Sequence, residues 1–207
     1  MMKEYPTIPG VAKSPRDYCL AFYKYDGSNL RFEWSKKNGW NKFGTRHRLF
    51  DETDEVFAPA IEIFNRMIAP QIDPILKKEF REAQEFTAYC EFFGDESFSG
   101  QHKIDDKTKQ LVLFDVNVHK RGFIEPRAFY KLFGGLDIAA KLVYEGDINE
   151  EFIQMVRTNT LPGVNLNEGV ICKGGTKHDR WMTKIKTNQY LEKLKAVYAD
   201  GWQEYWE

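Results

Sequence analysis

Several features that would place a chain in a specialised class are scarce here. The 207 residues include three cysteines, Cys19, Cys90 and Cys172, which lie far apart and form no C-x-x-C pair. Neither a zinc knuckle nor a closed disulfide framework is therefore expected. No apolar run approaches the ~20 residues of a membrane span, and the opening MMKEYPTIPG lacks the apolar core of a signal peptide. We expect a cytoplasmic protein with no membrane partner.

An excess of charge of one sign is also missing, since the formal net charge is −1. This argues against a broad non-specific nucleic-acid binder, although a local basic groove remains compatible with it. The hydrophobic and charged fractions, 42% and 29%, are those of an ordinary globular protein. Without a repeat or a long linker, we expect residues 1–207 to form a single domain.

Short alternating stretches between turn signals predict the strands. The turns are Asp26-Gly27-Ser28 and the Asn-Gly centre of residues 36–39. The expected strands are Tyr18–Lys24, Asn29–Trp34, Phe86–Phe93, Gln110–Val118, Gly169–Lys173 and Trp181–Ile185.

Helical spacing and capping signals mark the helices between them. Asp73-Pro74 is read as a cap followed by proline at the first helical position. The expected helices are 54–69, 74–85, Pro126–Phe133, a helix capped by Asn149 that runs to Arg157, and Asn188–Tyr198. Strands and helices without regular βαβ alternation predict an α+β fold on antiparallel sheets.

Charged residues stand at the ends or in the middle of apolar strands. Lys24 ends one strand just before the Asp26-Gly27 turn, and Glu91 interrupts another. Taken alone, Lys24 is more often a solvated strand end. A carboxylate such as that of Glu91 is costly inside a sheet unless it is hydrogen-bonded or faces a cation.

Three further charges follow the same pattern nearer the C-terminus. Glu168 begins an apolar strand, while Lys184 and Lys186 stand two residues apart on the last one. Side chains at i and i+2 of a strand share a face, so the two lysines repel each other unless an anion lies between them.

Read in order, these residues resemble the signature of the covalent nucleotidyltransferase superfamily, which comprises DNA ligases, RNA ligases and mRNA capping enzymes. The surrounding patterns are K-Y-D-G-S-N, A-Y-C-E-F-F-G, E-G-V-I-C-K and W-M-T-K-I-K. Gly44-Thr45-Arg46 is similar to the arginine-bearing element of the family. Leu113-Phe114-Asp115-Val116 is similar to the segment whose aromatic residue stacks on adenine.

The likeness is greatest to the phage-type nick-sealing RNA ligases. The opening Y-P-T-I-P-G, the closing K-T-N-Q-Y-L-E-K and Asn29 are similar to theirs. In two respects the chain departs from them. Asp26 stands where those enzymes often carry histidine and DNA ligases carry aspartate, and we expect no C-terminal OB or helical domain after Lys186.

The resemblance implies an α+β nucleotidyltransferase domain of the ATP-grasp-like ligase adenylation type, with antiparallel β-sheets and flanking helices. It implies ATP and Mg²⁺ (or Mn²⁺) as cofactors and three steps. A lysine takes AMP from ATP, AMP moves to a 5′-phosphate, and a 3′-hydroxyl displaces it. Lys24 would be the nucleophile. An ordinary lysine, with a pKa of about 10.4, is almost wholly protonated at neutral pH and needs activation.

The remaining roles follow from the resemblance in the same way. Lys184 and Lys186 would hold the α-phosphate, and Glu168 would bind magnesium, through water. Glu91 and Asn29 would face the ribose. The other nucleotide contacts would come from Asp26, Gly27, Arg46 on ribose or phosphate, and Phe114 on adenine.

Two basic stretches lie outside these motifs. Residues 34–48 mix Trp34, Trp40 and Phe43 with lysines and arginines, which suits either a nucleic-acid surface or a solvated hairpin with a packed inner face. A second basic loop is expected at Lys173, Lys177, His178 and Arg180.

The function expected is ATP-dependent sealing of 3′-hydroxyl and 5′-phosphate ends in nicked duplex RNA or an RNA-containing duplex. If the source is a phage or virus, the location would be the host cytoplasm. A small ATP-dependent DNA ligase is the alternative enzyme, and a capping guanylyltransferase fits Asn29 and the tail less well. A non-catalytic nucleic-acid-binding subunit is the alternative of another class.

Overall fold

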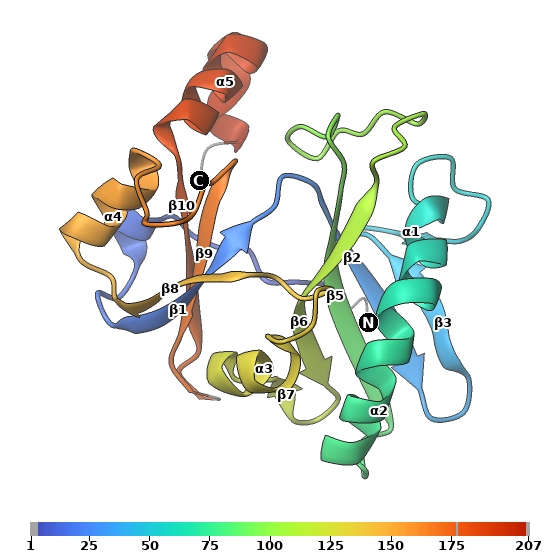
Figure 1. Ribbon diagram of the computed structural model, residues 1–207. Helices are drawn as coiled ribbons and strands as arrows, with labels where there is room; N and C mark the ends of the chain where they lie inside the picture. Colours follow the sequence, from blue (N-terminus) through green and yellow to red (C-terminus); the bar gives the residue numbers. More distant parts are fainter. Residues whose placement is uncertain (1–3, 177, 206–207) are drawn as a thin grey trace. The chain divides into compact units, whose positions relative to one another are not determined.

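The computed structural model describes residues 4–176 and 178–205, and the chain divides into two compact units (Figure 1). The first unit contains residues 4–6, 27–124 and 128–140. The second contains residues 7–26, 125–127 and the described residues from 141 onward. Each unit has its own antiparallel sheet, so each is described by itself.

The sheet of the first unit has six strands in the order β4-β3-β2-β5-β6-β7. Every neighbouring pair is antiparallel. The strands are β2 (Ser28–Ser35), β3 (Gly39–Gly44), β4 (Leu49–Phe50), β5 (Glu85–Phe93), β6 (Gln110–Val118) and β7 (Gly122–Phe123).

One face of this sheet is apolar and is covered by a nearly continuous helical segment, visible in teal in Figure 1. The segment consists of α1 (Ala58–Ile63), the π-helical η2 (Phe64–Ile68) and α2 (Ala69–Glu79). Leu30, Phe32 and Trp34 of β2 are buried on this face, and the Phe32 ring stacks on Phe64 with centroids 3.9 Å apart. Helix α3 (Pro126–Phe133) follows β7.

The predicted break between two helices in this region is wrong. Asp73-Pro74 does not begin a helix but lies inside α2, which ends at Glu79 rather than at residue 85. The Asp73 carboxylate instead accepts a hydrogen bond from Trp40 Nε1 at 2.8 Å and pairs with Lys77 at 2.5 Å. The tertiary contact with Trp40 and the i,i+4 pair within α2 together override the local capping signal.

The start of the helical segment also differs from the prediction. Asp54 accepts hydrogen bonds from the backbone N–H groups of Val56 and Phe57, at 3.0 and 2.9 Å. The regular helix begins only at Ala58, because this side chain organises a turn before it.

The sheet of the second unit has four antiparallel strands in the order β10-β9-β1-β8. The strands are β1 (Tyr18–Lys24), β8 (Leu142–Asp147), β9 (Gly169–Gly174) and β10 (Trp181–Lys186). Around them lie η1 (Val11–Lys13), α4 (Glu150–Arg157), α5 (Asn188–Tyr198) and η3 (Ala199–Tyr205). Cys19, Ala21, Val170, Cys172 and Ile185 meet residues of α4 in one buried core.

The predicted α+β fold with antiparallel sheets is confirmed. Strands β1 and β6 and helices α3 and α5 have the predicted bounds, and Asn149 caps α4 by accepting from Phe152 N at 2.8 Å. Strand β3 follows the predicted Asn-Gly turn but had no predicted bounds, and β4, β7 and β8 were not predicted. Strands β4 and β7 have two residues each, and β8 contains Glu145, Gly146 and Asp147, so none of these three carries a strand pattern. Among the described residues, no helix has the length and apolarity to cross a membrane.

Candidate functional site

The ends of three neighbouring strands in the second unit bring two of the predicted lysines into one row. Lys24 at the end of β1 lies opposite Gly169 at the start of β9, and Gly169 lies opposite Lys186 at the end of β10. Residues in register across a sheet project to the same face. The two lysines therefore flank a position that has no side chain of its own.

Glu168, the residue before Gly169, binds both lysines. The Lys24 Nζ lies 2.6 Å from Glu168 Oε2, and the Lys186 Nζ lies 3.3 Å from Glu168 Oε1. The side chains of Glu168 and Lys186 are 4% and 6% exposed, whereas that of Lys24 is 21% exposed. The side chain of Lys24 is thus partly open to solvent, while its two partners are buried.

The charged form of Lys186 is destabilised in this arrangement. Burial lowers the pKa of Lys186 from its ordinary value, Glu168 opposes that shift, and the charge of Lys24 adds to it. One carboxylate thus stabilises two cations at a place where water is largely excluded.

Gly169 has to be glycine for the row to form. Its φ is +151°, and a Cβ built on it would lie 2.0 Å from the carbonyl oxygen of Ile185. The close approach of β9 and β10 at this point places Glu168 between the two lysines.

The same face of the sheet carries further lysines. Lys184 stands two residues before Lys186 on β10, so it projects from the same face. Lys173 was assigned to a basic loop, but it belongs to β9, is 4% exposed, and places its ammonium 5.4 Å from the centroid of the Phe22 ring. Of the other residues assigned to that loop, His178 and Arg180 follow β9, and Lys177 lies outside the described residues.

Helix α5 is tied to this cluster at its first turn. Tyr190 donates a hydrogen bond to Asp26 Oδ1 at 2.8 Å, and the Lys186 ammonium lies 5.2 Å from its ring centroid. Thr187, the N-cap of α5, donates its backbone N–H to the carbonyl of Glu168 at 2.9 Å. Burial, and then the charges of Glu168 and Asp26, raise the pKa of Tyr190, so its hydroxyl remains a donor.

In the first unit, β2 and β5 carry two of the predicted residues side by side. Asn29 lies opposite Glu91 in the antiparallel register, and both are half-buried on the face that the helices do not cover. Gly27 precedes β2 at a point where a Cβ would lie 2.1 Å from the carbonyl oxygen of Phe92. The D-G-S-N stretch can therefore approach β5 this closely only with glycine at residue 27.

Phe114 occupies a β-bulge on this sheet. Tyr89 pairs with Asp115 and Cys90 with Leu113, so Phe114 has no opposite residue on β5. Bulges redirect a side chain out of the regular alternation. The Phe114 ring is half-buried and meets the Tyr5 ring edge-on, with centroids 5.0 Å apart.

Arg46 lies at the tip of the turn between β3 and β4, and is half-buried. Thr45 closes this turn by donating its N–H to the carbonyl of Arg48 at 2.9 Å. Beside it, the guanidinium of Arg31 fills the space over Gly44, donates to the carbonyl of Thr45, and pairs with Glu33 at 3.0 Å. The ion pair of Arg31 and Glu33 thus packs against the G-T-R segment and holds it in place.

Glu168 of the second unit is the predicted metal ligand. Among residues 4–176 and 178–205, no three His, Cys, Asp or Glu side chains come together as metal ligands. Magnesium in nucleotide sites typically takes one or two carboxylates and completes its shell with phosphates and water. Both oxygens of Glu168 already face lysines, so its contact to such an ion would pass through water.

Comparison with known proteins identifies the fold. No protein-family model matches the chain, and no curated protein matches it significantly. Among solved structures, an archaeal ATP-dependent RNA ligase matches over 95% of this chain and 52% of its own, at 17% identity and a TM-score of 0.63. A Naegleria gruberi RNA ligase variant with AMP and manganese matches over 93% and 58%, at 15% identity and a TM-score of 0.62. The chain has the fold of these RNA ligases.

The matched region is only part of those proteins. The chain spans 52% of the length of another Naegleria gruberi RNA ligase variant with AMP and manganese, at 18% identity and a TM-score of 0.59. It thus corresponds to about half of each of these RNA ligases.

Within this RNA-ligase fold, sequence reasoning missed several contacts around the lysines. Tyr190 and Thr187 were part of the K-T-N-Q-Y resemblance, yet nothing in their spacing assigned them partners at Asp26 and Glu168. Their signal was the first turn of α5, whose N-cap Thr187 directly follows Lys186.

The sequence left two interpretations of the basic stretch of residues 34–48, a nucleic-acid surface or a solvated hairpin with a packed inner face. Phe43 is buried and Trp40 binds Asp73, which favours the hairpin with a packed inner face for these two residues. Lys36, Lys37 and Lys42 remain exposed.

Proposed function

We propose that this chain is the nucleotidyltransferase part of an ATP-dependent RNA ligase, that residues 1–207 form one such domain, and that it seals nicks in the manner of the phage-type enzymes. The observation that carries the proposal is the contact of Lys24 with Glu168 at 2.6 Å, with Lys186 on the second carboxylate oxygen. A strand-end lysine held in place by a buried carboxylate is a positioned nucleophile rather than a solvated strand end.

In the first step, the lone pair of the neutral Lys24 amine forms a P–N bond to the α-phosphorus of ATP. The α–β phosphoanhydride bond breaks, pyrophosphate leaves with its electron pair, and the nitrogen releases a proton to water. AMP is then linked to Lys24. Phosphoryl transfer of this kind requires mainly positioning and neutralised charge.

The residues around Lys24 provide that positioning. Glu168 sets the direction of the Lys24 side chain, and Lys186 and Lys184 provide positive charge for the α-phosphate from one face of the sheet. Magnesium, when bound, would supply further positive charge to the phosphates of ATP. Asp26 acts through Tyr190, which fixes α5 beside Lys186.

The nucleoside contacts come from the first unit. Asn29 and Glu91, opposite each other on β2 and β5, offer an amide and a carboxylate to the ribose hydroxyls. Phe114, turned out of the regular alternation by its bulge, offers its ring to adenine. Arg46 contacts ribose or phosphate from the β3–β4 turn, and Gly27 lets the preceding turn approach closely.

In the second step, an oxygen of a 5′-phosphate attacks the phosphorus on Lys24, the P–N bond breaks, and the nitrogen takes a proton from water, which returns the amine. In the third step a 3′-hydroxyl attacks that 5′-phosphate, loses its proton to water, and AMP leaves. The partner is therefore a nucleic acid with adjacent 3′-hydroxyl and 5′-phosphate ends, and we assign it to nicked duplex RNA or an RNA-containing duplex.

The test is transfer of label from α-³²P ATP to the protein in the presence of magnesium. Wild type should form the adduct, Lys24→Arg should not, and Lys13→Ala, which removes an exposed lysine in the same unit, should behave as wild type. Equal labelling of Lys24→Arg would defeat the assignment. Wild type without label would favour a non-catalytic nucleic-acid-binding subunit.

Asp26 gives the sequence one feature of DNA ligases, so a second measurement compares nicked RNA, DNA and hybrid duplexes. Sealing of duplexes with RNA at the nick is the expected result. Sealing of DNA alone would make the protein a small ATP-dependent DNA ligase.

A further inference from the structure

A pocket in the first unit lies where the ends of three segments meet. Strand β2 ends at Ser35, helix α2 ends at Glu79, and β5 begins at Glu85 after a short connection. Lys36 N–H donates to the carbonyl of Gln84 at 2.9 Å and ties two of these segments together. The pocket has a volume of about 270 Å³ and is lined by Trp34, Lys36, Lys77, Phe80, Arg81, Ala83 and Phe86.

The floor of the pocket is aromatic. Trp34 and Phe86 are 8% and 2% exposed, with ring centroids 4.9 Å apart, and the half-buried Phe80 meets Phe86 nearly edge-on at 6.3 Å. The Lys77 ammonium lies 5.6 Å from the centroid of the Trp34 ring, so a face of the indole is directed toward this rim. Of these three rings, that of Phe80 is the most accessible to a flat ring placed in the pocket.

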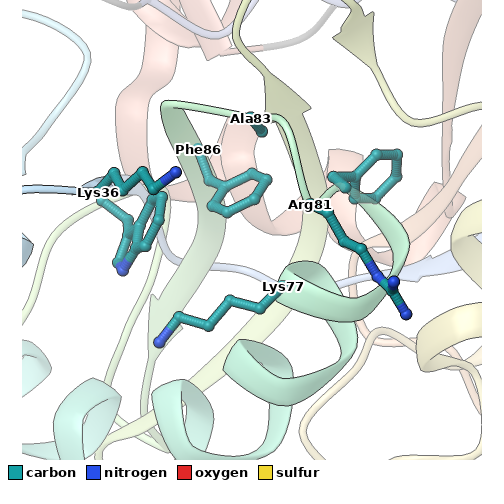
Figure 2. A pocket seen from close by; sticks show the side chains of 7 residues that line it. Lys36, Lys77, Arg81, Ala83 and Phe86 are labelled. Atoms are coloured by element: carbon teal, nitrogen blue, oxygen red, sulfur yellow. The ribbon is translucent and has the colours of Figure 1, made fainter.

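The rim of the pocket is positively charged. Figure 2 shows Lys36, Lys77 and Arg81 around the ring of Phe86, and all three cations are exposed. Asp73 neutralises part of the charge of Lys77, at 2.5 Å, but no carboxylate lines the pocket. A ligand that fits needs a flat apolar part and negative charges on more than one side of it.

We propose that this pocket binds a single-stranded segment of RNA, with one base against the aromatic floor and the flanking phosphates on Lys36, Lys77 and Arg81. Cations on more than one side of the pocket suit a polymer that carries a phosphate on each side of the base. A pocket of about 270 Å³ accepts one base and leaves the rest of the strand outside. Aromatic floors with cationic rims are a general means of holding unpaired strands.

This inference rests on the proposed function for its choice of RNA, and it adds to that function a contact that needs neither ATP nor Lys24. The pocket uses Trp34 and Lys36 from the basic stretch, together with the end of α2, which the sequence pattern did not connect to it. A strand held here would be recruited by contacts independent of adenylation.

The test measures binding of a fluorescein-labelled oligouridylate to the full chain by anisotropy, without nucleotide. The pocket variant is Lys36→Glu/Arg81→Glu. The control is Lys37→Glu/Lys78→Glu, which changes the net charge equally at exposed neighbours that do not line the pocket. We expect the Kd to rise about tenfold or more for the pocket variant and less than about twofold for the control.

A third variant separates stacking from charge. Phe80→Leu keeps an apolar side chain and removes the ring, so affinity should fall about threefold with an unchanged salt slope. Equal losses in the two charge variants, no loss in the pocket variant, or competition by polyglutamate as effective as by unlabelled RNA would each overturn the site. The proposed function is tested separately, because a missing Lys24 adduct alongside pocket-dependent RNA binding would reject only the ligase.

Discussion

The hydroxyl of Tyr190 donates a hydrogen bond to the carboxylate of Asp26 across 2.8 Å, which joins the first turn of α5 to the segment that follows Lys24. Asp26 is 6% exposed. Its identity, which by resemblance pointed toward DNA ligases, therefore has a local structural reason: it anchors α5. An aspartate with this structural role does not by itself indicate whether the substrate is DNA or RNA.

Tyr190→Phe tests that anchor. The variant keeps the ring beside Lys186 but removes one donor from a buried carboxylate, which typically costs about 1–3 kcal/mol. We expect a lower melting temperature and slower adduct formation. Tyr130→Phe, at an exposed tyrosine of α3, should change neither. Unchanged melting and adduct formation in Tyr190→Phe would show that the contact has no energetic role.

Glu168→Gln should abolish adduct formation. The amide keeps the shape of the side chain but leaves Lys24 and Lys186 without their shared counter-ion. Breaking a buried pair costs about 3–5 kcal/mol, and we expect the lower end because Lys24 is 21% exposed. Thermal denaturation should show the loss. Adding Lys186→Met should restore part of the stability and none of the activity, since it removes the cation left unpaired. Retained labelling in Glu168→Gln would assign Glu168 a purely structural role.

His102 should make the first unit sensitive to acid. Ser28 donates its hydroxyl to the carbonyl of Gly100, so His102 Nε2 donates to Ser28 at 2.8 Å, and Nδ1 of the neutral ring accepts from Ser97 at 2.9 Å. Burial, with the nearby Lys109, lowers the pKa of His102 to about 4, while Asp106 opposes the shift. The neutral ring thus supports Ser28, the neighbour of Asn29.

Because the folded-state pKa lies below the ordinary 6.5, this contribution is present above pH 6.5 and is lost as the pH falls through 4. After allowance for solvent screening, we expect it to be about 1–2 kcal/mol. Denaturant titrations between pH 7 and 4 should show a steeper loss for wild type than for His102→Gln. Parallel curves would place the acid sensitivity on other groups.

Gly169→Ala should prevent the row of Lys24, Glu168 and Lys186 from forming. A residue strained at φ +151° costs about 1–3 kcal/mol, and the added Cβ would also collide with the carbonyl of Ile185. Gly163→Ala is the matched control, because Gly163 has a φ of +70° but open space around it. It should lose stability through strain alone and keep its adduct. Equal effects in both variants would remove the role given to the close approach of β9 and β10.

Sealing should prefer nicks to unpaired ends and should weaken with salt. A template places the 3′-hydroxyl beside the 5′-phosphate, so less positioning is asked of the protein. A net charge of −1 leaves binding to local patches of lysine and arginine. Between low and physiological salt, nick sealing should fall severalfold while labelling of Lys24 changes little. Joining of unpaired ends as fast as nicks, without a response to salt, would indicate an end-joining ligase.

Local pattern was enough to predict elements whose signals lie within a few residues. Strand β6 is a run of mostly apolar, strand-favouring residues, and Asn149 caps α4 through its own neighbour at Phe152. The prediction failed where distant residues decide the outcome, as at Asp73 of α2, whose carboxylate accepts a hydrogen bond from Trp40 of β3. The row of Lys24 and Lys186 depends on a register with Gly169 that no local window contains.

The central place of β1 in the four-stranded sheet has a consequence for how the protein is made. Both partners of this strand, β8 and β9, are more than a hundred residues further along the chain. During synthesis, β1 therefore leaves the ribosome with two unpaired edges. Both edges remain unpaired while the segment from Gly27 to Ala140 is synthesised. Such an edge invites aggregation. Chaperone protection of the nascent chain should thus matter until β9 has emerged, and fragments that end before Leu142 should be the most prone to aggregate.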